Sequence, residues 1–326
     1  MRPRVYVTQP VAASALERLR RAAEVELNSD ALHIATKAEL IEGARRADVL
    51  FCLLHDAVDR DVIAANPKLK AVASMTITPA DIDVAEATRR QIPVTVIPAL
   101  LLNDATADLA WALLMAAARR VAEGDRLMRS GVFPGSQSCH MVGGGVSGKI
   151  LGIVGMGGVG KAVARRAAGF AMRVLYYDPN RLPASEEKDL GIVWTPFEKL
   201  LAEADFVSIH TRLTPETRHL LGDREFALMK PAAFLVNTAR GPIVDEQALV
   251  RALAEKRIAG AGLDVYEHEP RPHAALLGME NVVFSPHTGS AVRELREAMA
   301  NVVVDNILAV LEGKRPPNCY NPEIYK

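Results

Sequence analysis

Cysteine is scarce in this sequence. Its three cysteines, Cys52, Cys139 and Cys319, lie far apart and form no CxxC pair. Zinc sites, redox-active cysteine pairs and disulfide frameworks need cysteines at short or regular spacings. The sequence therefore argues against all three, predicts no metal site, and fits a protein of the reducing cytoplasm.

An excess of charge of one sign and long apolar runs are also missing. The 39 basic residues balance the 39 acidic ones, so no overall field favours nucleic acid or an anionic membrane. The segment MRPRVYVTQP lacks the apolar core of a signal peptide, and the run LAWALLMAAA at residues 109–118 is too short to span a bilayer. We expect neither export nor membrane insertion, and small molecules or other subunits as partners.

Short apolar segments alternate with helical patterns along the 326 residues. Segments that are apolar nearly throughout indicate a parallel sheet covered by helices on both faces. A chain of this length exceeds one ordinary core, so we expect two domains. The predicted strands are RVYV, DVLFCLL, LKAVAS and IPVTVI in the first part and, after the glycine-rich linker at 141–148, KILGIVG, RVLYYD, DFVSIH, AAFLVNT, AGLDV and VVFSPH.

Two long helical patterns set the predicted domain boundaries. Residues 103–131 form one, which begins at a cap residue, Asn103 or Asp104, and joins the two sheets. Residues 291–313 form the other, and we expect its apolar stripe to pack on the first domain. The sequence thus predicts an α/β protein with a discontinuous first domain, residues 1–103 and 290–326, and a second domain at 104–289.

The first strand of the second part runs into a glycine-rich turn that opens a helix. Gly155, Gly157 and Gly160 form GxGxxG, and Gly158 and Val159 lie inside it. These glycines allow a tight turn, close approach of a pyrophosphate, and close packing of helix on strand, while the helix N-terminus faces the negative charge. The pattern predicts a dinucleotide site, although a glycine turn that binds nothing is the alternative.

Asp178 ends the second strand of this part, where a carboxylate would accept hydrogen bonds from the adenosine ribose. An acid at this place repels a 2′-phosphate, so NAD is favoured over NADP. Arg181, close by in the sequence, argues in the opposite direction.

Three later strand ends carry Arg240, Asp264 with Glu269, and His287. Ligands of open parallel sheets bind at the carboxyl ends of the strands. Hydride transfer to a ketone needs a proton donor such as histidine, a carboxylate that stabilises the imidazolium, and a fork such as arginine for a substrate carboxylate. Each residue also has an ordinary alternative: Arg240 as a helix-entry donor, Glu269 as a turn residue, and His287 as a core histidine.

At these residues the chain resembles the D-isomer-specific 2-hydroxyacid dehydrogenases, especially their glyoxylate/hydroxypyruvate reductase branch. The resemblance covers nearly the whole chain through DIDVAEATRR, DATADLAWALLMAAARR, GKILGIVGMGGVGKAVA, VNTARGPIVDEQAL, AGLDVYEHEP and SPHTGSA. It implies two Rossmann-like domains, a flavodoxin-like substrate domain and an NAD-binding domain, that close over a cleft. It also implies a homodimer paired through the cofactor domain.

The resemblance assigns roles to individual residues. Arg240 would bind the substrate carboxylate, Glu269 would support the histidine, and His287 would be the acid/base. It also implies three groups of cofactor-binding residues: those at the nicotinamide end, one on the adenine side, and chain neighbours of these residues. These are Thr106, Thr238, Asp264 and Gly289 at the nicotinamide end, His210 on the adenine side, and their neighbours Thr211 and Ala239.

The departures from the family pattern surround the expected substrate pocket. Where the family has a Gly-x-Gly turn, this chain has Thr76-Ile77-Thr78, and β-branched residues resist positive φ. VIPA replaces the usual NTPG, and Leu53, Leu54 and His55 end the opposing strand. We therefore expect the catalytic residues to be intact and to act on a small 2-keto or 2-hydroxy acid. The sequence does not specify which acid is preferred.

Two alternatives remain. The stretches EGDRLMRSGVF and AGFAMRVLYYDP also resemble phosphite dehydrogenases, but those carry a lysine in the turn where this chain has Ile77 or Thr78. A non-catalytic NAD(H) sensor of the corepressor type would share the fold, and the altered loop favours it. The complete set of Arg240, Glu269 and His287 argues against it.

Overall fold

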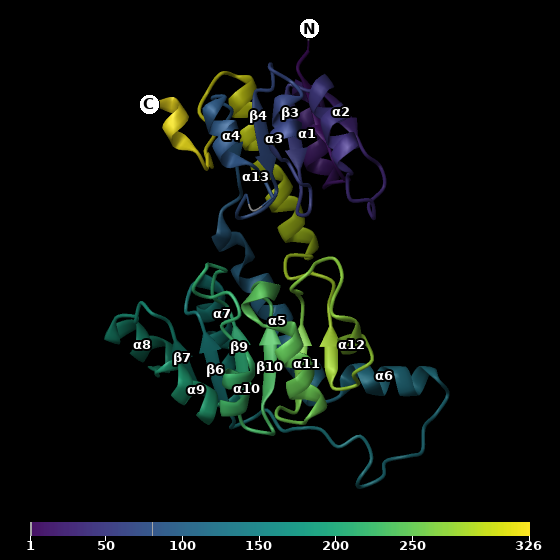
Figure 1. Ribbon diagram of the computed structural model, residues 1–326, viewed down its shortest axis with the longest axis vertical. Helices are drawn as coiled ribbons and strands as arrows, with labels where there is room; N and C mark the ends of the chain where they lie inside the picture. Colours follow the sequence, from purple (N-terminus) through teal and green to yellow (C-terminus); the bar gives the residue numbers. More distant parts are fainter. Residues whose placement is uncertain (1, 80) are drawn as a thin grey trace. The chain divides into compact units, whose positions relative to one another are not determined.

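The computed structural model describes residues 2–79 and 81–326. The chain divides into two compact units. Unit 1 comprises Met1–Leu101 with Ala291–Lys326, and unit 2 comprises Leu102–Ser290. Figure 1 traces the chain from unit 1 into unit 2 and back for the C-terminal helix.

Unit 1 is built on a five-stranded sheet in the order β2-β1-β3-β4-β5. All its strand pairs are parallel, and this order is the flavodoxin-like one. β1, β3 and β4 are buried along almost their whole length, as a sheet covered on both faces requires. The strands are β1 (Arg4–Val7), β2 (Glu24–Leu27), β3 (Val49–Cys52), β4 (Ala71–Ser74) and β5 (Val94–Thr95).

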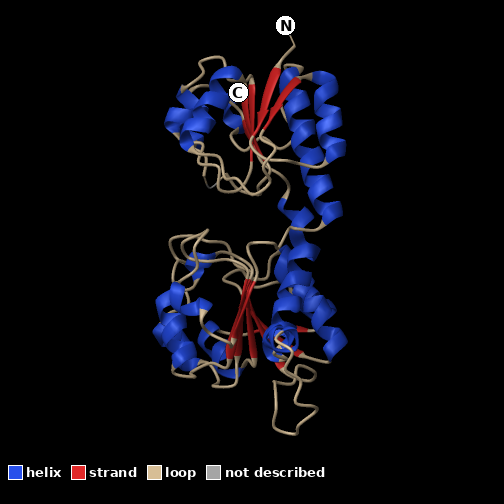
Figure 2. Cartoon of the chain, turned by 90° about the vertical axis from the view of Figure 1, so that its right-hand side faces the viewer, coloured by secondary structure: helices blue, strands red, loops and turns tan. Residues whose placement is uncertain are grey.

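Helices flank both sides of this sheet (Figure 2). α2 begins with a capping box, in which the Thr36 hydroxyl accepts from the Glu39 amide and the Glu39 carboxylate accepts from Thr36. The C-terminal helix α13 packs against α1 and β4, and it buries Met299, Val303 and Ile307. The helices of unit 1 are α1 (Ala13–Ala22), α2 (Lys37–Arg46), α3 (Arg60–Ala64), α4 (Val84–Arg89) and α13 (Arg293–Leu311).

Unit 2 contains a seven-stranded sheet in the order β12-β11-β10-β9-β6-β7-β8. Every strand pair is parallel. Counted from β6, the first six strands follow the dinucleotide-binding order 3-2-1-4-5-6, and β12 extends it. The strands are β6 (Ile150–Val154), β7 (Arg173–Tyr177), β8 (Ile192–Trp194), β9 (Phe206–Ile209), β10 (Phe234–Asn237), β11 (Gly260–Leu263) and β12 (Val282–Phe284).

Two buried apolar clusters fill the space between this sheet and its helices. One contains Leu200, Leu235 and Leu249, and the other contains Trp111, which stacks on Phe170 with ring centroids 4.7 Å apart. The helices are α5 (Asn103–Ala118), α6 (Val121–Arg129), α7 (Gly158–Ala167), α8 (Ala184–Leu190), α9 (Phe197–Glu203), α10 (Asp223–Leu228), α11 (Glu246–Ala254) and α12 (Ala274–Leu277).

The helical segment Ala99–Ala118, a short 3-10 turn continued by α5, is long and apolar enough to cross a membrane by length and composition. It extends N-terminally beyond the apolar run at residues 109–118, which by itself is too short to span a bilayer. α5 packs against α7, β10 and β11 and contributes Ala107, Ala110 and Leu114 to the core of unit 2.

Three elements differ from the sequence expectation. The charged alternating segment Glu24–Leu27 forms β2, and the three-residue segment Ile192–Trp194 forms the edge strand β8. The helical stretch 103–131 is broken because Arg120 adopts a left-handed conformation, with φ of 54°, between α5 and α6. Short edge strands carry few buried positions, so their apolar signal is weak.

Candidate active site

The glycine turn joins β6 to α7 at the carboxyl edge of the sheet of unit 2. Gly155 has φ of +94°, and a Cβ atom there would lie 2.5 Å from the backbone nitrogen of Thr211. A Cβ on Gly160 would lie 2.2 Å from the carbonyl oxygen of Gly155, whereas one on Gly157 would meet nothing within 4 Å. The turn is therefore tight on its protein side and open beside Gly157, the residue before the N-terminus of α7.

Asp178 follows β7 and is tied to this turn. One carboxylate oxygen accepts the Met156 amide and the other accepts the Asn180 amide, both at 2.9 Å. The turn and the end of the neighbouring strand thus form one rigid edge. An amide-rich turn at a helix N-terminus, with a carboxylate at its side, fits the pyrophosphate and ribose of a dinucleotide.

Two polar atoms at the neighbouring strand ends are buried without a hydrogen-bond partner in the described part of the chain: His210 Nδ1 after β9 and Thr238 Oγ1 after β10. His210 Nε2 pairs with the Ser208 hydroxyl at 2.8 Å, and desolvation lowers the pKa of His210 to about 3. The ring is therefore neutral at physiological pH. Buried polar atoms normally have partners, so both atoms fit a site that receives a polar ligand.

Asp264, at the end of β11, fastens the loop that follows β12. Its carboxylate accepts the amides of Thr288 and Gly289 at 2.7 and 2.9 Å, and its carbonyl oxygen accepts the His287 amide at 2.9 Å. Burial raises the pKa of Asp264, and the two amides act against that rise. Thr106, on α5, reaches the Gly289 carbonyl at 3.4 Å. The backbone of His287 is therefore fixed from several sides.

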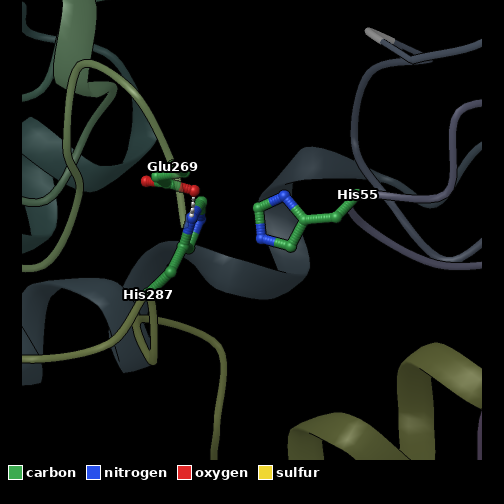
Figure 3. A group of neighbouring side chains, drawn as sticks. All are labelled: His55, Glu269 and His287. Atoms are coloured by element: carbon green, nitrogen blue, oxygen red, sulfur yellow. Dashed lines mark hydrogen bonds and ion pairs between the residues drawn. The ribbon is translucent and has the colours of Figure 1, made fainter. Parts of the chain in front are cut away.

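The side chains of Glu269 and His287 meet, as Figure 3 shows. His287 Nδ1 lies 2.8 Å from Glu269 Oε2, and the two side chains are 24% and 17% exposed, His287 being the more exposed. Glu269 Oε1 accepts the Tyr266 amide at 3.1 Å. Tyr266 in turn donates its hydroxyl to the Ser285 carbonyl at 2.8 Å, so the two loops that carry Glu269 and His287 are tied together.

Arg240 lies on the adjacent strand end, after β10. Its Nη1 donates to the Ala239 carbonyl at 2.7 Å, and Asn237 Nδ2 donates to the Arg240 carbonyl at 3.0 Å. Burial lowers the pKa of the Arg240 guanidinium, while the nearby charge of Glu269 opposes that change. A half-buried cation beside a carboxylate–imidazole pair can hold an anion at this edge.

The expected substrate residues lie in unit 1, at the ends of β3 and β4, which are paired neighbours. Leu53, Leu54 and His55 follow β3, and His55 has φ of 74°. Thr76 donates its hydroxyl to the Thr78 carbonyl at 2.7 Å and contacts Ser74 Oγ at 2.6 Å. The loop Thr76–Thr78 thus closes on itself through a side chain, without the positive φ that glycines provide.

Sequence reasoning missed the residues that hold these loops. Asp56 is buried and accepts the Leu53 amide at 2.7 Å and the Thr8 hydroxyl at 2.5 Å. Tyr266, inside the segment AGLDVYEHEP, ties Glu269 to the end of β12. The signal that the sequence offered for Asp56 was an acid close behind the apolar run at residues 49–54. No pattern in the sequence distinguishes Tyr266 from a core tyrosine.

A dinucleotide-type sheet whose strand ends carry an arginine and a glutamate–histidine pair defines a nicotinamide-dependent oxidoreductase. The protein-family model described as "D-isomer specific 2-hydroxyacid dehydrogenase, NAD binding domain" matches residues 111–289. The chain therefore belongs to the D-isomer specific 2-hydroxyacid dehydrogenase family, and it is an oxidoreductase acting on the CH–OH group of 2-hydroxy acids.

Full-length relatives agree. The glyoxylate reductase of Korarchaeum cryptofilum is 48% identical over 100% of this chain and 98% of its own length. That of Thermococcus litoralis is 44% identical over 99% and 98%. The TT0316 protein of Thermus thermophilus, known from a crystal structure, is 43% identical, with a TM-score of 0.89 over 97% of this chain and 99% of that one.

Proposed function

We propose that this protein reduces a small 2-keto acid, with glyoxylate as the first candidate, using NADH. The observation that carries the proposal is the Glu269–His287 pair beside Arg240 at the carboxyl edge of a dinucleotide-type sheet. The full-length similarity to proteins named glyoxylate reductase supports the choice of substrate. Reduction, rather than oxidation, is the proposed working direction.

His287 protonates the carbonyl oxygen of the substrate. When bound, the reduced nicotinamide supplies the hydride that adds to the carbonyl carbon. Because Nδ1 of His287 is directed at Glu269 at 2.8 Å, Nε2 is the ring nitrogen that delivers the proton. The carboxylate stabilises the imidazolium until the alkoxide forms. Glu269 is a positioning residue, and its own position depends on the Tyr266 amide.

Arg240 binds the substrate carboxylate in this proposal. A guanidinium offers two parallel donors that match a carboxylate, and burial disfavours its charge until an anion arrives. Leu53, Leu54, His55 and the loop Thr76–Thr78 of unit 1 select among 2-keto acids. Since Thr76 already donates its proton to Thr78, its hydroxyl acts by shaping the loop rather than by donating to the substrate.

NAD is the proposed cofactor, in preference to NADP. Asp178 holds a negative charge beside the glycine turn, and a 2′-phosphate would be repelled there. The residues proposed to hold the cofactor surround the carboxyl edge of the sheet of unit 2. They are Thr106, Gly155, Gly157, Gly158, Val159, Gly160, Asp178, His210, Thr211, Thr238, Ala239, Arg240, Asp264, His287 and Gly289.

A homodimer in the cytoplasm is the proposed state of the protein. The segment between α5 and β6 exposes several large apolar side chains, and it belongs to the unit that carries the glycine turn. Large exposed apolar side chains that lie close together in the chain are candidates for an interaction surface. These side chains are Val121, Met128, Val132, Phe133 and Val142, with exposures of 57%, 55%, 49%, 72% and 63%.

Replacing Phe133 by glutamate is expected to convert the dimer into monomers, because a charge would enter an apolar interface. Sedimentation velocity of the wild type and the variant measures the change. Leu32→Glu is the matched control, since Leu32 is 93% exposed in unit 1 and its replacement leaves the dimer intact. A wild type that sediments as a monomer contradicts the dimer, and a dimeric Phe133→Glu variant contradicts this interface.

The substrate is tested with a panel. Oxidation of NADH and of NADPH is followed with glyoxylate, hydroxypyruvate, pyruvate, phenylpyruvate and 2-ketogluconate, and reduction of NAD with phosphite. We expect NADH oxidation with glyoxylate at the highest kcat/KM, and slower oxidation of NADPH. Phosphite oxidation would replace the proposal by a phosphite dehydrogenase, and NADH binding without turnover of any keto acid would replace it by a cofactor sensor.

A further inference from the structure

Arg181 follows Asp178 in the loop after β7, and it is the cation that could oppose the proposed NAD preference. An arginine near the adenosine ribose accommodates a 2′-phosphate in dinucleotide-binding sheets. In this protein Arg181 is engaged elsewhere. Its Nε and Nη2 donate to the two carboxylate oxygens of Glu187, each at 2.9 Å, which is the bidentate geometry of a strong arginine–carboxylate pair.

Glu187 is held in place from inside the unit. It lies on α8, its side chain is 11% exposed, and its Oε1 also accepts the Tyr176 hydroxyl at 2.6 Å. Tyr176 is fully buried in β7 and its hydroxyl accepts the Leu182 amide at 2.9 Å. Hydrogen bonds from Arg181, and then from Tyr176, lower the pKa of Glu187 to about 2. The carboxylate is therefore charged under all physiological conditions.

The Arg181 guanidinium also lies over the indole ring of Trp194. The Arg181 Cζ atom is 5.8 Å from the centroid of the Trp194 ring, which is within cation–π range. Trp194 Nε1 donates to the Asp178 carbonyl at 3.1 Å. Asp178, Arg181 and Trp194 thus share one network, and the guanidinium is directed to Glu187 and the indole.

A second cation near the turn also pairs with a glutamate of α8. Lys161, on α7, pairs with Glu186 at 2.5 Å. Two consecutive glutamates of α8 therefore each bind one cation from the segments that flank the glycine turn. A negatively charged group that entered this region would have to compete with both carboxylates.

We propose that Glu187 is a cofactor-specificity residue that withdraws Arg181 from the adenosine 2′ position. This inference rests on the proposed use of NAD. Asp178 repels a 2′-phosphate directly, and Glu187 occupies the one arginine of the loop that would attract it. Removing the Glu187 charge releases Arg181 and shifts the protein toward cofactors with a 2′-phosphate.

The test measures binding rather than turnover. Calorimetry on the full chain gives the Kd of NAD⁺ and of NADP⁺ for the wild type and for Glu187→Gln, and the ratio of the two constants is the readout. A charge-assisted hydrogen bond is worth on the order of tenfold or more in affinity, so we expect the ratio to move about tenfold toward NADP⁺. General loosening of the loop affects both cofactors and cancels in the ratio.

Two further variants separate the explanations. In Arg181→Gln/Glu187→Gln the shift should disappear, because the released guanidinium produces it. In Asp223→Asn, which breaks the bidentate Arg251–Asp223 pair elsewhere in unit 2, the ratio should stay at the wild-type value. High salt should diminish the Glu187→Gln shift, because the new contact is ionic.

The inference is overturned if folded Glu187→Gln keeps the wild-type ratio, or if the double variant retains the shift. If Glu187→Gln does not fold, Arg181→Gln alone decides. If Arg181 is already withdrawn from the 2′ position, Arg181→Gln leaves the NADP⁺ affinity unchanged. A weaker NADP⁺ affinity in Arg181→Gln overturns the inference. A wild type that binds NADP⁺ as tightly as NAD⁺ contradicts both the proposed NAD preference and the withdrawal of Arg181. A wild type that prefers NAD⁺, with no change of the ratio in Glu187→Gln, contradicts the withdrawal alone.

Discussion

Replacing His287 by glutamine is expected to lower kcat for keto-acid reduction by about two to four orders of magnitude, the usual contribution of general acid catalysis. Glutamine has no proton to give at neutral pH, and its amide still fits beside Glu269. NADH binding should be largely retained, because the other residues proposed to hold the cofactor, including the turn at Gly155–Gly160, are untouched. The measurements are steady-state kinetics with the best keto acid and calorimetric titration with NADH.

His268→Gln serves as the matched control for this prediction. His268 is an exposed histidine next to Glu269 in the chain, so the same substitution tests the site without removing the proposed acid. The control should keep wild-type turnover. A His287→Gln variant that binds NADH and turns over at the wild-type rate would remove His287 from the mechanism.

Alanine substitutions in the glycine turn are expected to separate folding from cofactor binding. In Gly157→Ala the new Cβ meets no atom within 4 Å beyond its chain neighbours, so the thermal unfolding midpoint of the protein without cofactor should change little. The same Cβ would occupy the side from which a pyrophosphate approaches the amides. Loss of such charged hydrogen bonds weakens binding by about 10- to 100-fold.

For Gly160→Ala we expect the opposite result, with the main loss in stability. Its Cβ would lie 2.2 Å from the Gly155 carbonyl oxygen, so the strand and the helix must separate, and overpacking of this kind costs about 1–3 kcal/mol of unfolding free energy. The unfolding midpoint should fall even without cofactor. Calorimetric NADH affinity and thermal unfolding of both variants test the pair. Unaltered NADH affinity in both variants would mean that this turn does not bind the cofactor.

The parallel sheets were predictable because their central strands are apolar on both faces. β6, β9 and β11 are buried almost throughout, and such runs indicate strands in a covered parallel sheet. β2 and β8 escaped the same reasoning because edge strands bury fewer positions. The break at Arg120 escaped it because a single left-handed residue leaves the helical pattern on either side intact.

The local geometry of the candidate site was predictable where a motif fixes it, and the contacts between loops were harder to predict. The order strand, GxGxxG, helix determines the turn before any tertiary contact is considered. The resemblance implied that Glu269 supports His287. The role of Tyr266 in joining the two loops and the capture of Arg181 by Glu187, which Tyr176 of β7 also contacts, depend on tertiary packing. Sequence spacing carries no information about either contact.

We propose that hydride from NADH and a proton from His287 convert a 2-keto acid into a 2-hydroxy acid. The most direct test is to incubate the protein with glyoxylate and NADH deuterated at the transferable position, and to examine the product by NMR. We expect glycolate with deuterium at its hydroxyl-bearing carbon. Glycolate without deuterium, or no glycolate while NADH is bound, would contradict it.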